Sequence, residues 1–429
     1  EIGVRLVGSE MCIRDSYISL FSLGFAQQID SILYADLEEK GAWKNYYILN
    51  DNADYDFVTT SAKIDSIHVK GDKSVQQKVL RSLFRPLLGL SNQNLVITQF
   101  RNIKGAYTFL NNQSFVSFAQ YGNKQVAAVI NFHPQFKSQI SGILGGSKGT
   151  DGKWLTTGEV DLHLENPRGN GTISDLEWRQ PNDQSRFLNI AYEIPFPFGL
   201  PFGAKAEFLQ DFMEDAYILE SSSGMATSTG PFGRWMIGGK KENIHDMVDQ
   251  IDYNSESLIL GVLGDQRNNR WLPYQGSYWG FEINLGRWED REGQSKVLEA
   301  EGNFGYYNLL KNSVLYFSFW AQGKRVDKRD LPLAKKVRFG GAGTLRGYYE
   351  NQFNADWVMI QTTEWIFGDL SRSQIFLYTD IPFADGLSIK PGYGLGVRHY
   401  NGNLSLDIAA GFSSESTGTK IHLKFSSNL

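Results

Sequence analysis

The chain has 429 residues, of which 41% are hydrophobic, 14% aromatic and 21% charged. This composition is that of a folded protein, which excludes a disordered one. The single cysteine, Cys12, excludes a disulfide scaffold, a zinc ribbon and an iron–sulfur protein, because each needs several thiolates. The formal net charge of −5 gives no reason to expect a nucleic-acid partner, because phosphate binding depends on clustered positive charge.

The apolar pattern narrows the class further. No apolar run reaches the roughly 18 residues of a membrane-spanning helix, so a helical membrane protein is excluded. A membrane β-barrel is not excluded, because its lipid-facing residues alternate with polar ones and average hydropathy hides them. The six histidines are scattered without metal-ligand spacing, and we expect neither a metal site nor a cofactor.

The amino-terminal end contains two segments that we leave out of the fold. Residues 1–16 (EIGVRLVGSEMCIRDS) differ in character from the rest of the chain and resemble translated adapter sequence. Residues 17–26 form a short apolar run that ends at the small Ala26, which is typical of the tail of a secretory signal. The alternative for this run is a buried strand or the start of a helix.

Residues 63–135 change between strand and helix patterns. The segment IDSIHVKG alternates apolar and polar residues, as in a half-buried strand. A helix is expected from a capping box at Ser74, and a second helical pattern opens at Asn92. Two strands are expected at residues 115–119 and 125–132, around a YGN turn.

The resulting order, β-α-α-β-β, resembles a POTRA domain, including its first strand with Ile64, Ile67, Val69 and Gly71. Residues 27–62 look like the second helix and closing strands of an incomplete unit of the same kind. The resemblance implies a periplasmic domain with an exposed edge strand that adds unfolded polypeptides by main-chain hydrogen bonds. We place that edge at Phe115, Val116 and Phe118.

Residues 136–429 lose the helical signal and break into alternating segments separated by Gly, Pro, Asn and Asp. Sixteen strands are expected, at residues 136–144, 156–165, 172–179, 187–194, 203–212, 217–229, 234–241, 257–264, 277–285, 296–307, 314–323, 358–367, 373–380, 388–400, 404–412 and 420–426. The fold class is therefore mainly β, a 16-stranded antiparallel transmembrane β-barrel preceded by one α+β domain.

The connections between these segments differ in length on the two sides. Connections after even-numbered segments are short, such as NPRGNG and GDLSR. The two long ones, at residues 242–256 and 324–357, follow odd-numbered segments. Short turns on one side and long loops on the other are typical of an outer-membrane barrel, and a soluble β-sandwich has no reason to sort its loops in this way.

The alternation also assigns faces. In the last segment Ile421, Leu423 and Phe425 share one face while His422 and Lys424 share the other, so one face suits lipid and the other a wet lumen. Six aromatic residues near strand ends are expected to form an interfacial girdle, with ordinary core packing as the alternative. They are Trp271, Tyr274, Tyr278, Trp279, Trp288 and Trp365.

The second long loop ends in VRFGGAGTLRGYYENQF. Its Leu345-Arg346-Gly347-Tyr348 resembles the [V/L/I]-R-G-[F/Y] signature in the sixth extracellular loop of the BamA/TamA outer-membrane assembly superfamily. The following strands contain TEW, FLYTD and GYGLGVR, which resemble strand motifs of that family in the same order. The resemblance covers residues 63–429.

An arginine on a loop that folds back into the barrel can present its fixed donors to carboxylates on the inner wall. We expect Arg346 to reach Asp380 and Glu364 and so to hold the loop, the alternative being a solvated arginine in a mobile loop. Glycines of the same loop would let its backbone pass close to the wall. They are Gly340, Gly341 and Gly343.

We expect no catalytic residue and no enzymatic activity. Residues 145–149 satisfy G-x-S-x-G, but a nucleophile elbow must follow a strand and open a helix, and this segment lies in the first predicted hairpin.

The resemblance implies a protein of the bacterial outer membrane that helps to insert, assemble or translocate polypeptides. Its expected partners are the lipid bilayer, unfolded outer-membrane or secreted polypeptides bound through the POTRA domain, and accessory assembly subunits. The first and last strands would meet at a weak seam, which we place at Ile140, Gly142, Leu423 and Phe425. The alternatives are a two-partner-type secretion pore and a passive solute channel, although a channel needs no periplasmic docking domain.

Overall fold

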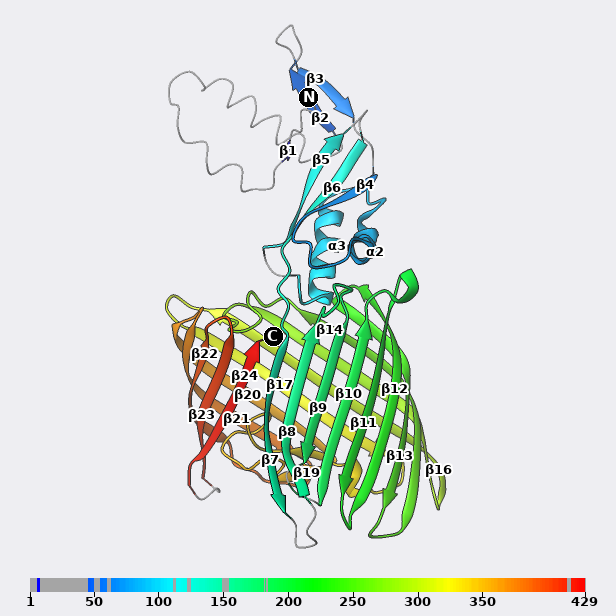
Figure 1. Ribbon diagram of the computed structural model, residues 1–429, viewed down its shortest axis with the longest axis vertical. Helices are drawn as coiled ribbons and strands as arrows, with labels where there is room; N and C mark the ends of the chain where they lie inside the picture. The colour runs from blue at the N-terminus through cyan, green and yellow to red at the C-terminus, as the bar shows by residue number, and fades with distance from the viewer. Residues whose placement is uncertain are drawn as a thin grey trace. The chain divides into compact units, whose positions relative to one another are not determined.

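The computed structural model describes residues 6–7, 45–49, 55–59, 63–110, 113–121, 125–148, 154–180, 182, 184–414 and 418–428 (Figure 1). The chain divides into two compact units, Glu1–Gln135 and Phe136–Leu429. Residues 17–26 lie outside the described part, as do all of residues 1–16 except the short strand β1 (Leu6–Val7). Among the described residues, the helices are too short or too polar to cross a membrane.

The first unit contains the expected β-α-α-β-β order, which is confirmed. Its elements are β4 (Ser66–Gly71), α2 (Gln77–Phe84), the 3-10 turn η2 (Arg85–Leu87), α3 (Gln93–Ala106), β5 (Phe115–Tyr121) and β6 (Gln125–Phe132). The sheet has the order β1-β5-β6-β4, with β4 and β6 parallel and β5 and β6 antiparallel. Apolar faces of both helices are buried, among them Leu83, Phe84, Phe100 and Ile103.

The two helix starts differ in how they are capped. The Asn92 side chain accepts a hydrogen bond of 2.7 Å from the Asn94 amide, so α3 begins where the sequence predicts. The capping box at Ser74 is wrong. The Asp72 carboxylate accepts from the Ser74 amide in a local turn, and α2 begins only at Gln77.

Two further strands, β2 (Asn45–Leu49) and β3 (Tyr55–Thr59), pair antiparallel. They fall where closing strands of an incomplete unit are expected, while the helix expected before them lies outside the described residues.

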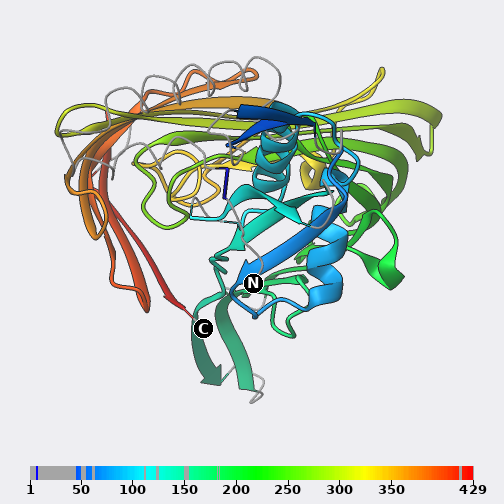
Figure 2. The ribbon, with the colours of Figure 1, turned by 90° about the horizontal axis from the view of Figure 1, so that it is seen from above.

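The second unit is a closed antiparallel barrel in which every expected segment becomes a strand (Figures 1 and 2). The sixteen strands are β7 (Gln139–Lys148), β8 (Trp154–Glu165), β9 (Ile173–Gln180), β10 (Ser185–Ile194), β11 (Gly203–Met213), β12 (Tyr217–Gly230), β13 (Gly233–Asp246), β14 (Ile251–Asp265), β15 (Gly276–Asp290), β16 (Gly293–Leu309), β17 (Val314–Val326), β20 (Trp357–Asp369), β21 (Ser373–Ala384), β22 (Gly392–Tyr400), β23 (Leu404–Ser413) and β24 (Lys420–Asn428). Neighbours along the barrel are also neighbours in sequence, and β24 returns to β7.

One of the two predicted long loops is wrong. Strand β13 extends to Asp246 and strand β14 begins at Ile251, so residues 242–256 are mostly a hairpin. Its charged residues suggested a loop, but Glu242 and Ile244 alternate with exposed neighbours and are buried inside the barrel. The other long loop, between β17 and β20, is present. On the side of the short turns, the connection between β14 and β15, at residues 266–275, is longer than the others, as the predicted segment bounds imply.

The outer and inner faces of the strands follow the predicted alternation. Ile421, Leu423 and Phe425 are 75%, 65% and 50% exposed on the outside, as are many aliphatic and aromatic residues of other strands. The inside contains charged residues together with packed apolar clusters. An apolar exterior around a polar interior is the arrangement expected of a barrel surrounded by lipid.

The predicted aromatic girdle is wrong for four of its six members. Trp288 is buried in a cluster inside the barrel, and the Tyr278 hydroxyl hydrogen-bonds to that of Tyr316. Tyr274 packs on the same cluster as Tyr316, and Trp271 stacks on an inward-facing tyrosine. The remaining two, Trp279 and Trp365, lie on the outward face of their strands, as expected.

Candidate functional site

The loop between β17 and β20, which we call loop 6, is folded against the inside of the barrel wall. It contains the short helix η4 (Leu333–Lys335) and two paired strands, β18 (Val337–Phe339) and β19 (Phe353–Ala355). Phe339, Leu345 and Tyr348 are at most 1% exposed and pack with Val358 and Ile360 of β20. The packing explains why a loop of this length has a defined path, since it has an apolar core of its own.

The Arg346 guanidinium lies between two carboxylates of the wall. Its Nε and Nη2 donate to the two oxygens of Asp380 at 2.8 and 2.7 Å, and its Nη1 donates to Glu364 at 2.7 Å. The Arg346 amide also donates to Asp380, at 3.1 Å, and the Thr362 hydroxyl donates to the same carboxylate at 2.8 Å. The structure therefore brings together the three residues that the sequence analysis paired.

A second arginine completes the charge arrangement. Arg398 of β22 donates two hydrogen bonds to Glu364, at 2.6 and 2.9 Å, and one to Asp407 of β23, at 2.9 Å. The guanidiniums of Arg346 and Arg398 also lie over aromatic rings, 3.6 Å from the centroid of Tyr378 and 4.0 Å from that of Phe376. Sequence reasoning gave Arg398 no role. Its inward-facing position directly after GYGLGV could have indicated one.

The loop backbone touches the wall at glycines. A Cβ on Gly347, whose φ is +94°, would come within 2.6 Å of the Phe412 carbonyl oxygen. A Cβ on Gly392 of β22 would come within 1.9 Å of the Arg346 carbonyl oxygen. The wall and the loop thus both need glycine at this contact.

The three glycines singled out in the sequence differ from one another. Gly340 and Gly341 have φ of +120° and +90°, which side chains rarely adopt. A Cβ on Gly343 would meet nothing within 4 Å, so close approach does not explain a glycine there. Tyr348 extends the contact, since its hydroxyl donates to the Lys390 carbonyl at 2.8 Å and accepts from Ser413.

Loop 6 has a second ionic contact on another part of the wall. Lys335, which is fully buried, donates to Glu242 of β13 at 2.5 Å and to Glu299 of β16. Lys240 bridges the same two carboxylates at 2.8 and 2.9 Å, so two cations and two anions form a closed quartet. Sequence reasoning missed this contact, because a lysine in a loop has the usual pattern of a solvated residue.

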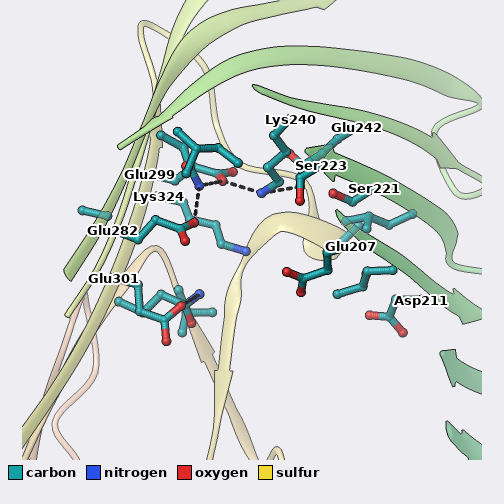
Figure 3. Close-up of a pocket in the computed structure, with 18 of the residues that line it drawn as sticks. Glu207, Asp211, Ser221, Ser223, Lys240, Glu242, Glu282, Glu299, Glu301 and Lys324 are labelled. Carbon is teal, nitrogen blue, oxygen red and sulfur yellow. Dashed lines mark hydrogen bonds and ion pairs between the residues drawn. The ribbon is translucent and has the colours of Figure 1, made fainter. Parts of the chain in front are cut away.

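The quartet borders a polar cavity of about 340 Å³ inside the barrel. Figure 3 shows Glu207 and Asp211 on one side of this cavity and Glu282, Glu299 and Glu301 on the other. Loop 6 contributes to its lining and reaches Asp211 through an ion pair from Arg338. The cavity is therefore a remnant of the lumen that loop 6 leaves open.

Among the described barrel residues, the seam between the first and last strands has the fewest opposed pairs. The register of β24 on β7 has two pairs, Ser427 opposite Ile140 and Asn428 opposite Gln139. By contrast, β24 pairs with β23 from Lys420 to Ser427. Figure 1 shows β7 and β24 diverging from the point where they meet.

The residues expected at the seam lie on these two strands. Ile140 is opposite Ser427, and Leu423 and Phe425 lie on the part of β24 that has no opposed residue of β7 in the described chain. Ile140 and Leu423 are therefore not opposed to each other across the seam. A Cβ on Gly142 would come within 2.5 Å of the Glu159 carbonyl oxygen, so this glycine allows the close packing of β7 on β8.

The residues expected at the edge of the first unit all lie on β5. Phe115 is 46% exposed, Val116 is half-buried and Phe118 is buried. On the side away from β6, β1 pairs with Phe118 and Ala119, so the prediction of an exposed edge is wrong at Phe118.

No protein-family model matches the sequence, and no curated protein matches it. Solved structures do match. CdiB from Escherichia coli aligns with a TM-score of 0.60 and 11% identity, over 93% of this chain and 83% of that one. The fold is that of CdiB and BamA.

Two further structures extend this result. CdiB from Acinetobacter baumannii aligns with a TM-score of 0.55 and 14% identity, over 94% of this chain and 82% of that one. BamA from Haemophilus ducreyi, in a form lacking POTRA domains 1–3, aligns with a TM-score of 0.50 and 14% identity, over 95% of this chain and 94% of that one. The alignments thus cover both the barrel and the α+β unit, and at these identities they establish a shared fold.

Proposed function

We propose that the protein is an outer-membrane factor of the BamA/TamA type, which assists the insertion or assembly of polypeptides at the membrane. The seam carries this proposal. In the described part of the chain the register of these two strands has two opposed pairs, which leaves backbone donors and acceptors for a further strand. A β-strand can enter lipid only when such groups are paired. The apolar exterior supports the membrane location.

In this function the first unit is a periplasmic POTRA domain. Its β-α-α-β-β order and the residues of β5 away from β1 offer main-chain groups to an unfolded polypeptide. Binding of this kind does not depend on side-chain sequence, which suits a factor with several client proteins. Accessory assembly subunits and the lipid bilayer are the other partners we propose, and no step requires catalysis.

The two alternatives both need an open lumen. A passive channel or a secretion pore conducts through the inside of the barrel, whereas loop 6 is fixed there by Arg346 on one part of the wall and by Lys335 on another. The arrangement favours a route through the seam. A two-partner-type secretion pore would require both contacts to break in every transport cycle.

A disulfide across the seam tests the proposal. Ile140→Cys and Ser427→Cys, in a Cys12→Ser background, place two thiols at opposed positions. The matched control is Ser405→Cys with Ser426→Cys, an opposed pair between β23 and β24. Each pair is expressed in place of the native protein in the producing bacterium, and outer-membrane proteins are quantified under oxidising and reducing conditions.

We expect the oxidised seam pair to deplete other β-barrels from the outer membrane, the reductant to restore them, and the control pair to have no effect. Normal barrels with an oxidised seam would refute the proposal. Loss of one secreted protein alone would instead establish a secretion pore, and a fixed conductance for small solutes in planar bilayers would establish a channel.

A further inference from the structure

The connection between β14 and β15, at residues 266–275, has a rigid structure of its own. The Asn268 side chain accepts hydrogen bonds from the amides of Tyr274 and Gln275, both at 3.1 Å. The Asn269 side chain accepts from the amides of Trp271 and Leu272, at 2.8 and 3.1 Å. Two asparagines that replace missing backbone partners fix the path of this loop without a helix or strand.

The loop reaches the beginning of the barrel through Arg270. This guanidinium donates to both oxygens of Glu165, the last residue of β8, at 2.6 and 2.7 Å. The Glu165 side chain is 4% exposed and also accepts from the Lys137 amide at 2.8 Å, two residues before β7 begins. Strands β9 to β13 separate β8 from β14 along the wall, so the contact crosses the inside of the barrel.

The next residue reaches the end of the barrel. The Trp271 ring stacks on Tyr400 of β22, with centroids 4.6 Å apart and planes 13° apart, and the Lys137 ammonium lies 4.7 Å from the Trp271 centroid. The Tyr400 hydroxyl accepts a hydrogen bond of 3.2 Å from the side chain of Asn428, one of the two residues of β24 that pair with β7. Adjacent loop residues therefore contact both sides of the seam.

We propose that residues 266–275 form a clasp that holds the seam closed at its paired end. A bidentate ion pair with the buried carboxylate of Glu165 on β8 and an aromatic stack on Tyr400 of β22 join strands on the two sides of the seam, whose described register has two opposed pairs. Arg270 and Trp271 are positioning residues, since they act on the seam through Glu165 and Tyr400. The inference rests on the proposed function, because a contact that holds the seam closed has a role when the seam opens during that function.

Hydrogen exchange of the purified full chain in nanodiscs, followed by mass spectrometry, tests the clasp. The variants are Arg270→Ala and Glu165→Gln, which break the ion pair from either side, and Trp271→Ala, which keeps it. The control is Arg372→Ala, an exposed arginine in another turn on the same side of the barrel. The readout is the exchange of the peptides that cover residues 137–142 and 424–428.

We expect exchange of these two segments to accelerate at least tenfold in the three clasp variants, with no change in the control or in peptides from β11 to β13. Unchanged exchange at the seam would overturn the proposal. Equal acceleration throughout the barrel would also overturn it, because the loop would then be a general support. If Arg270→Ala does not fold, Trp271→Ala decides between these outcomes.

The measurement needs no client protein. A clasp can therefore be established even if the seam-disulfide experiment refutes an assembly role. Conversely, an assembly role can hold while Arg270 and Trp271 leave exchange at the seam unchanged.

Discussion

Replacing Arg346 by alanine is the sharpest test of how loop 6 is held. The substitution removes three side-chain hydrogen bonds, two to Asp380 and one to Glu364, and the contact with the Tyr378 ring. Asp380 is fully buried and would keep the Thr362 hydroxyl and the backbone amide of residue 346 as donors. Glu364 would keep Arg398. One of the two carboxylates therefore loses its only side-chain cation among the described ion pairs.

Removing one partner of a buried ion pair typically costs about 3–5 kcal/mol, because the remaining charge stays buried. We expect Arg346→Ala to lie in this range. Arg346→Lys should recover part of the loss, since an ammonium supplies the charge without the fork that spans both oxygens of Asp380. Asp380→Asn should cost about 1.5–3 kcal/mol, because it removes a charged acceptor while Arg346 keeps Glu364.

Two measurements check this prediction: the free energy of unfolding by urea in detergent micelles, and the rate of trypsin cleavage within residues 327–356. Arg372→Ala is the control and should change the unfolding free energy by less than about 0.5 kcal/mol, as an exposed substitution does. A loss below about 1 kcal/mol for Arg346→Ala, with cleavage as slow as in the native protein, would show that the loop is held by its apolar packing and that the ionic contact is dispensable.

Three further substitutions test other contacts. Lys335→Met should cost about 3–5 kcal/mol and speed trypsin cleavage of loop 6, unlike Lys336→Met; equal effects would contradict a second anchor. Gly392→Ala should prevent loop 6 from docking, as trypsin cleavage would report, whereas Gly343→Ala has open space and should be tolerated. Burial lowers the pKa of Lys137 to about 8, so the unfolded chain binds more protons above that pH; stability should rise from pH 8 to about 10.5 in urea titrations, and Lys137→Met should lack this rise.

The strands of the barrel could be predicted because each carries its own signal. Alternation with a period of two, interrupted by turn residues, is a local property, and all sixteen segments contain it. The hairpin at β13 and β14 was missed because its inward positions are charged. Glu242 has a partner in Lys335, which is distant in sequence, and no local pattern records that pairing.

The face on which each aromatic residue lies could be predicted from the sequence, by following odd and even positions along each strand. Tyr278 and Trp288 share even numbering with Glu282 and Asn284 on one strand, and these polar residues mark the inward face. Trp279 has the opposite parity and faces outward. The contacts of Arg270 could not be predicted from the sequence, because they depend on which strands the closure of the barrel brings opposite each other.

The charged groups around Arg346 have a mechanical consequence for the barrel. Glu364, Asp380, Arg398 and Asp407 belong to β20, β21, β22 and β23 in turn, and side-chain bonds within the group tie each strand to the others. We therefore expect these four strands to move together as one rigid group. The last strand is joined to loop 6 more weakly, by a single hydrogen bond of 3.3 Å from the Gly347 amide to His422 of β24, so an opening of the barrel on this side would have to break that bond first.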